Sequence, residues 1–73
     1  MKITLTTGEC KTAKNATWAH CGVFYGDETL HVNVNNIPCT LPLNGNGSVE
    51  IDKRCWQVSV RQIDDEEVEL TID

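Results

Sequence analysis

Residues 56–73 read WQVSVRQIDDEEVELTID, and two runs within this stretch alternate strictly between apolar and polar side chains. The apolar positions are Trp56, Val58 and Val60 in the first run and Val68, Leu70 and Ile72 in the second. A period of two is typical of strands that have one buried and one solvent-facing side. The acidic segment Asp64–Glu66 between the runs predicts a turn, so the stretch indicates an antiparallel hairpin.

Alternation of the same period runs through most of the chain, and helical spacing is almost absent. Strands are expected at residues 1–6, 17–25, 29–35, 39–43, 48–52, 56–61 and 68–72. The segment Gly8–Asn15 is expected to be a loop or at most one helical turn. The predicted fold is all-β, a small antiparallel β-sandwich or partly open barrel of six to seven short strands. Residues 1–73 leave room for a single small β domain.

Glycine, asparagine and proline mark the breaks between these strands. The strongest turn signal is Asn44–Gly47, because both of its residue types tolerate the positive φ of a tight hairpin. We expect it to join residues 39–43 directly to residues 48–52. Pro38 and Pro42 lack an amide hydrogen, so the segment between them is expected at a sheet edge or as an irregular segment.

The strand at residues 17–25 is apolar on both sides and is expected to be central in its sheet. A three-residue loop after it would direct Trp18, His20 and Phe24 into the core. A four-residue loop would reverse the strand and expose the three rings as a binding strip. We favour the buried arrangement because Trp and Phe contribute most to small cores.

The four cysteines, Cys10, Cys21, Cys39 and Cys55, invite pairing into two disulfides, with three possible connectivities. The first residues of the chain argue against disulfides. Met1–Thr6 alternates and lacks the apolar stretch of a secretory signal, so we expect a cytoplasmic protein, in a compartment that keeps thiols reduced. Oxidised and reduced cysteines therefore stay equal alternatives. Secretion is the alternative, if Met1 was added to a mature domain.

Metal and catalytic sites are weakly indicated. The cysteines, together with His20 and His31, are zinc-ligand types, but none of them forms the close pairs of structural zinc sites. We therefore expect no metal and no cofactor. Cys21 and His31 share one predicted hairpin, yet no orienting group or oxyanion site accompanies them. The sequence therefore predicts a protein that is not an enzyme.

The net charge of −5 is unevenly distributed, since residues 1–61 carry +1 and residues 62–73 carry −6. Such a patch repels nucleic acid and anionic membranes and attracts a basic protein surface. A plainer interpretation is that charges on a terminal edge strand discourage aggregation. No apolar run is long enough to cross a membrane.

Two functions follow from these observations. The first is a small acidic inhibitor or modulator, of phage or mobile-element type, that binds a protein with a basic surface and acts by contact or nucleic-acid mimicry. It would bind neither nucleic acid nor membrane directly. Its expected contacts are Asp64, Asp65, Glu66, Glu67 and Glu69, with Trp18 and Phe24. The alternative is a secreted, disulfide-stapled β module of effector, toxin or lectin type, whose loops carry the function.

Overall fold

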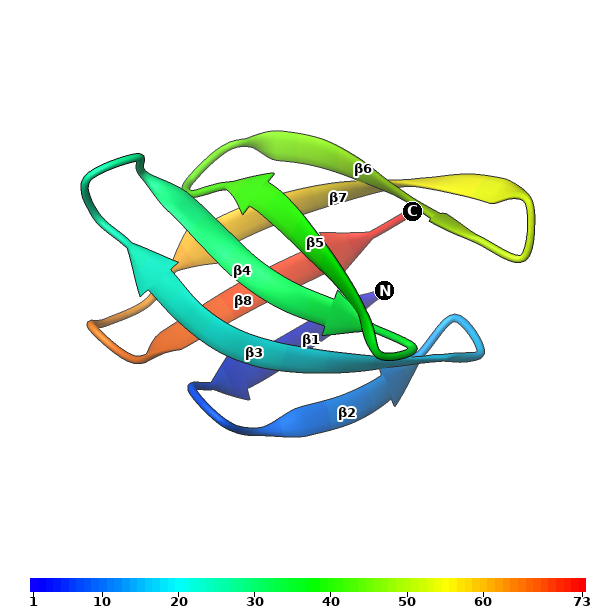
Figure 1. Ribbon diagram of the computed structural model, residues 1–73, viewed down its shortest axis with the longest axis horizontal. Helices are drawn as coiled ribbons and strands as arrows, with labels where there is room; N and C mark the ends of the chain where they lie inside the picture. Colours follow the sequence, from blue (N-terminus) through cyan, green and yellow to red (C-terminus); the bar gives the residue numbers. More distant parts are fainter.

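The computed structural model describes all residues from 1 to 73, and strands are its only regular elements. They are β1 (Lys2–Thr6), β2 (Cys10–Ala13), β3 (Ala16–Phe24), β4 (Thr29–Val34), β5 (Ile37–Pro42), β6 (Asn46–Ile51), β7 (Arg54–Gln62) and β8 (Glu67–Ile72). Sheet A has the order β1-β8-β7-β6, and sheet B has the order β2-β3-β4-β5. The two sheets face each other as layers (Figure 1). The predicted all-β sandwich is confirmed, with eight strands instead of six or seven and without an open barrel.

The chain runs up and down through both sheets, and all strand pairs are antiparallel. It changes sheet at Thr7–Glu9 and again at Leu43–Gly45. The pairing of β1 with β8 joins the two ends of the chain. The β1–β2, β3–β4, β5–β6 and β7–β8 loops therefore gather at one end of the sandwich (Figure 1). The other three loops and both termini lie toward the opposite end.

The core lies between the sheets and is built from alternate residues of the strands. Its buried apolar side chains are Ile3, Leu5, Ala13, Ala16, Trp18, Leu30, Val32, Val34, Leu41, Val49, Ile51, Val58, Val60, Val68, Leu70 and Ile72. His20 is the one buried polar residue. The strict alternation in β4 and β8 reflects strands that have one side against this core and the other outside it.

A β-bulge in β3 determines which of the side chains of Trp18, His20 and Phe24 face the core. The pairing with β4 shifts between His20 and Gly22, so that Cys21 is an extra residue. Trp18 lies before the bulge and is fully buried, whereas Phe24 lies after it and is 53% exposed. The loop after β3 has four residues, 25–28, so the three-residue loop is wrong. Each of the two predicted side-chain orientations is nevertheless right for one half of the strand, because an extra residue reverses the side on which later side chains lie.

Three two-residue turns join strands at the end opposite the four loops. They are Lys14–Asn15, Asn35–Asn36 and Asp52–Lys53, and every one of these residues has a φ between 51° and 67°. Two successive positive φ angles are the mark of type I′ turns, whose twist matches that of the strands they connect. Asn and Asp occupy four of the six positions, consistent with their tolerance of this conformation.

The prediction of a tight hairpin at Asn44–Gly47 is wrong. β5 and β6 belong to different sheets, so the segment is a crossover. Asn44 fastens it to sheet A, because its Oδ1 accepts a hydrogen bond from the backbone N of Gln62 at 2.8 Å. Gly47 permits a close approach of the sheets, since a Cβ there would lie 2.8 Å from Leu41 Cδ2.

Two other placements differ from expectation and two agree. The expected loop Gly8–Asn15 contains strand β2, at an edge of sheet B. The acidic strand β8 lies between β1 and β7 and is not an edge strand. β3 is central and β5 is at an edge, as its two prolines predicted.

The first crossover depends on Gly8. The backbone N of Glu9 donates to Thr6 O at 2.8 Å, closing a turn in which Gly8 has a φ of +87°. The backbone N of Gly8 also donates to His20 O at 2.8 Å, which attaches the turn to β3. A positive φ at this position is typical of type II turns and strongly favours glycine.

Replacing Gly8 with alanine should lower the free energy of unfolding by about 1–2 kcal/mol, the cost of holding a side-chain-bearing residue in the left-handed region. The cost is one of backbone strain alone, since no atom lies within 4 Å of the added Cβ. Urea denaturation would measure it. Gly26→Ala is the matched control, because Gly26 has equally open surroundings without a positive φ. Equal losses in the two variants would contradict the assigned role of Gly8.

Candidate functional site

One end of the sandwich collects acidic side chains from three separate parts of the sequence. The β1–β2 loop supplies Glu9, the β3–β4 loop supplies Asp27 and Glu28, and the β7–β8 loop supplies Asp64, Asp65 and Glu66. All six side chains are exposed, and the four loops at this end contain no Lys or Arg. We call these six residues the acidic end. It holds more than half of the eleven acidic residues of the chain.

Two exposed apolar side chains lie among these carboxylates. Tyr25 is 55% exposed and Ile63 is 43% exposed. The Tyr25 hydroxyl accepts a hydrogen bond from Gln62 Nε2 at 2.7 Å and donates to Asp65 O at 3.4 Å. Tyr25 therefore links the β3–β4 loop of sheet B to the β7–β8 loop of sheet A.

The β7–β8 loop is internally hydrogen bonded. Asp64 Oδ1 accepts from the backbone N of Glu66 at 2.9 Å and from the backbone N of Glu67 at 2.8 Å. Glu66 O in turn accepts from the backbone N of Thr7 at 2.9 Å and from its hydroxyl at 3.2 Å. The carboxylate of Asp64 thus shapes the turn. The carboxylate of Glu66 makes no hydrogen bond, and that of Asp65 accepts only a long one from the Tyr25 hydroxyl, at 3.5 Å.

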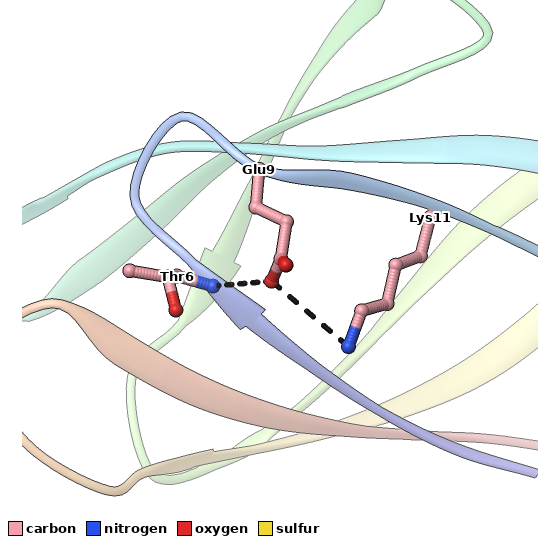
Figure 2. A network of polar contacts seen from close by, with 3 residues as sticks. All are labelled: Thr6, Glu9 and Lys11. Atoms are coloured by element: carbon pink, nitrogen blue, oxygen red, sulfur yellow. Dashed lines mark hydrogen bonds and ion pairs between the residues drawn. The ribbon is translucent and has the colours of Figure 1, made fainter.

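Glu9 differs from the other members of the acidic end because it is partly neutralised. Its Oε1 lies 3.0 Å from the backbone N of Thr6 and 3.9 Å from Lys11 Nζ, which extends from β2 (Figure 2). This is the single ion pair of the protein. The remaining carboxylates of the acidic end have no cationic partner, so their charges stay available to a basic surface.

The opposite end of the sandwich carries basic side chains. Lys14 Nζ lies 4.9 Å from the centre of the Trp56 ring, and Arg54 Cζ lies 5.7 Å from it. Cations at these distances are attracted to the face of an aromatic ring. With Lys53 in the neighbouring turn, these residues form what we call the basic end. Asp52 and Asp73 also lie toward this end and partly offset its cations, whereas the loops of the acidic end contain no Lys or Arg. Negative charge is therefore concentrated at the acidic end.

The predicted contact residues separate into different places. Asp64, Asp65 and Glu66 belong to the acidic end. Glu67 and Glu69 are half-buried on the outer side of β8, where Glu69 lies opposite Arg61. Trp18 is fully buried and its Nε1 donates to Ala13 O at 2.9 Å, so it is unable to touch a partner. Phe24 is exposed, but it lies on the outer side of sheet B.

Sequence reasoning missed Glu9, Asp27, Glu28, Tyr25 and Ile63. Each flanks or lies within a segment that the sequence marked as irregular. An up-and-down strand order would have placed the acidic loops at one end, but turn signals alone do not show that order. The missing information was therefore topological.

All four cysteines are free thiols in this structure. Cys10 and Cys21 are exposed on the outer side of sheet B, and Cys39 lies at its edge, partly packed against the core. Cys55 is exposed on the outer side of sheet A. No disulfide is formed, and the separation of the two outer sides leaves Cys55 with no cysteine on its own side.

His20 is buried beneath the acidic end, with 1% of its surface exposed. Its Nε2 lies 3.5 Å from the Thr7 hydroxyl, and its Nδ1 has no hydrogen-bond partner. Burial lowers the pKa of His20 below its ordinary value of 6.5, and the influence of the nearby Glu66 backbone opposes this shift only in part. The folded protein therefore favours a neutral His20.

Stability should fall as the pH drops from 7 toward 5.5. The unfolded chain binds a proton at His20 near pH 6.5, whereas the folded chain binds it only at lower pH, so acid favours the unfolded state. Urea unfolding at several pH values would show this slope in the wild type and a smaller slope in His20→Gln. The His31→Gln variant serves as control and should keep the slope. A slope unchanged in His20→Gln would contradict the assignment.

The surface has no pocket, and no three His, Cys, Asp or Glu side chains are grouped so that they could hold a metal ion. The protein has no helix of the length and apolar character needed to cross a membrane. No protein-family model, curated protein or solved structure matches the chain.

Proposed function

We propose that this chain is a non-enzymatic binding protein whose acidic end docks on a basic surface of a larger protein and thereby blocks or modulates it. The observation that carries the proposal is the gathering of six exposed carboxylates by three loops that are distant in sequence. Opposite charges across an interface accelerate association and select the partner.

The exposed side chains of Tyr25 and Ile63 also support the proposal that the acidic end is the contact surface. A purely acidic patch gives attraction that salt screens, whereas aromatic and apolar side chains supply the contact area from which interfaces gain most of their affinity. Tyr25 is held by hydrogen bonds to Gln62 and Asp65, so little freedom is lost when a partner covers it.

The acidic end is also preorganised. The bonds of Asp64 within its turn and the attachment of Glu66 O to Thr7 fix the β7–β8 loop before any partner arrives. A fixed array of negative charges is what mimicry of a phosphate backbone would require. A basic groove that binds nucleic acid is therefore one kind of surface that the acidic end would fit.

Charge reversal tests this proposal. We expect the double variant Asp65→Lys, Glu66→Lys to bind its partner at least roughly tenfold more weakly, equivalent to a loss of about 1.4 kcal/mol. Asp64 is left unchanged because its carboxylate shapes the turn. The measurement is affinity capture from a lysate, followed by titration of the purified captured protein against each variant.

The control is Glu50→Lys, Asp73→Lys, which gives the same net charge but alters exposed carboxylates outside the acidic end. It should bind as the wild type does. Unchanged binding in the acidic-end variant, or an equal loss in the control, would show that the acidic end is not the contact surface. Thermal melting of both variants checks that each remains folded.

A further inference from the structure

The outer side of sheet B carries no charged residue. Its outward-facing residues are Cys10 and Thr12 on β2, Thr17, Ala19, Cys21 and Phe24 on β3, Thr29, His31 and Asn33 on β4, and Pro38, Thr40 and Pro42 on β5. No Asp, Glu, Lys or Arg is among them. We call this surface the neutral face.

The outer side of sheet A is different, because its four strands present both signs of charge. Lys2, Glu50, Arg61, Glu67 and Glu69 all lie there among Ser, Thr, Asn and Gln side chains. With 23% of the chain charged, a whole sheet surface without charge is a marked departure from the rest of the molecule. Depletion of charge is the compositional sign of the central part of a protein interface.

A stacked aromatic pair, of which Phe24 is exposed and His31 is half-buried, lies on the neutral face. The rings of Phe24 and His31 are stacked with their centres 4.0 Å apart and their planes 22° from parallel. Phe24 remains 53% exposed even so. The bulge at Cys21 places it there, because without the extra residue Phe24 would point into the core. Stacked aromatic rings are rigid contact groups that lose little entropy when they are covered.

We propose that the neutral face is a self-association surface on which a second copy of this chain docks face to face. The net charge of −5 makes two copies repel each other in most orientations. The neutral face is the one broad surface through which they can meet without opposing like charges. A two-fold axis then makes the same patch serve both copies.

The polarity of the molecule selects the orientation of this dimer. A two-fold axis that lies in the plane of the interface and runs perpendicular to the strands makes the strands of the two copies antiparallel. It places the β3–β4 loop of one copy, with Asp27 and Glu28, beside the β2–β3 turn of the other, with Lys14. An axis parallel to the strands would instead bring the two acidic ends together. Charge complementarity therefore favours the antiparallel arrangement, in which the acidic end of one copy lies beside the basic end of the other.

The size of the neutral face limits the strength of the dimer. Four strands of about six residues cover roughly 20 Å by 19 Å, or roughly 400 Å² on each copy. Two copies would bury about 800 Å² in total, which lies below the range of stable complexes and within that of weak, transient ones. The neutral face shares no residue with the acidic end, so self-association does not depend on the acidic end binding another protein. Only the orientation of the dimer uses members of the acidic end, Asp27 and Glu28.

Sedimentation velocity of the full chain tests the proposal. Between about 10 μM and about 1 mM, the range of a weak association, the mean mass should rise from 8.1 kDa toward twice that value. Thr40→Glu and Asn33→Asp each place a like charge on both sides of the dimer, so both variants should stay near the monomer mass. Asn33→Asp is nearly isosteric and preserves folding if Thr40→Glu does not.

Ser48→Glu is the matched control, because it adds the same charge on an exposed hydroxyl position of the edge strand of sheet A. It should dimerise about as well as the wild type. A wild type that stays monomeric throughout, or neutral-face variants that dimerise like the control, would overturn the proposal.

Carbodiimide cross-linking of mixed light and heavy-isotope copies tests the orientation. Amide links between Lys14 of one copy and Asp27 or Glu28 of the other are expected. Links from Lys14 only to Asp52 or Asp73 of the other copy would overturn the antiparallel arrangement, because these carboxylates lie toward the same end as Lys14.

Discussion

The structure depends on the burial of the inward sides of two sheets against each other. The chain has no helix with which to cover a sheet, so each layer is the only available cover for the other. In a domain of 73 residues this contact contributes nearly all the apolar burial, and stability at this size is marginal. Every strand must therefore keep its apolar side inward. The bulge in β3 changes which side chains meet this core: Trp18 and Val23 both face it although they are an odd number of residues apart, and Phe24 is left outside.

Strands with strict alternation were predictable, because burial on one side leaves a direct signature in the sequence. β4 and β8 are the clearest cases. β2 left no such signature, since Ala13 is its only buried residue and the rest of this edge strand is exposed. The prediction of a hairpin at Asn44–Gly47 was wrong for another reason. Turn residues show that the backbone can bend, and they carry no information on which sheet the next strand joins.

The acidic end was predictable only in part. The run Asp64–Glu66 is visible in the sequence, and its attraction for basic surfaces follows from charge alone. The contribution of Glu9, Asp27 and Glu28 comes from the up-and-down order of the strands, which no local pattern records. The neutral face was hidden for the same reason, since its residues come from four strands and become one surface only when those strands are in register.

The pairing of β1 with β8 has a consequence for synthesis on the ribosome. The four strands of sheet B are joined by short connections and can pair as soon as residues 10–42 have emerged. β1 is synthesised before sheet B, yet its only neighbour in sheet A is β8, which follows all the other strands. The nascent protein thus carries an unpaired β1 and an uncovered half-core until β8 has been synthesised. We expect a chain truncated before β8 to expose both, which makes it a substrate for chaperones and proteases.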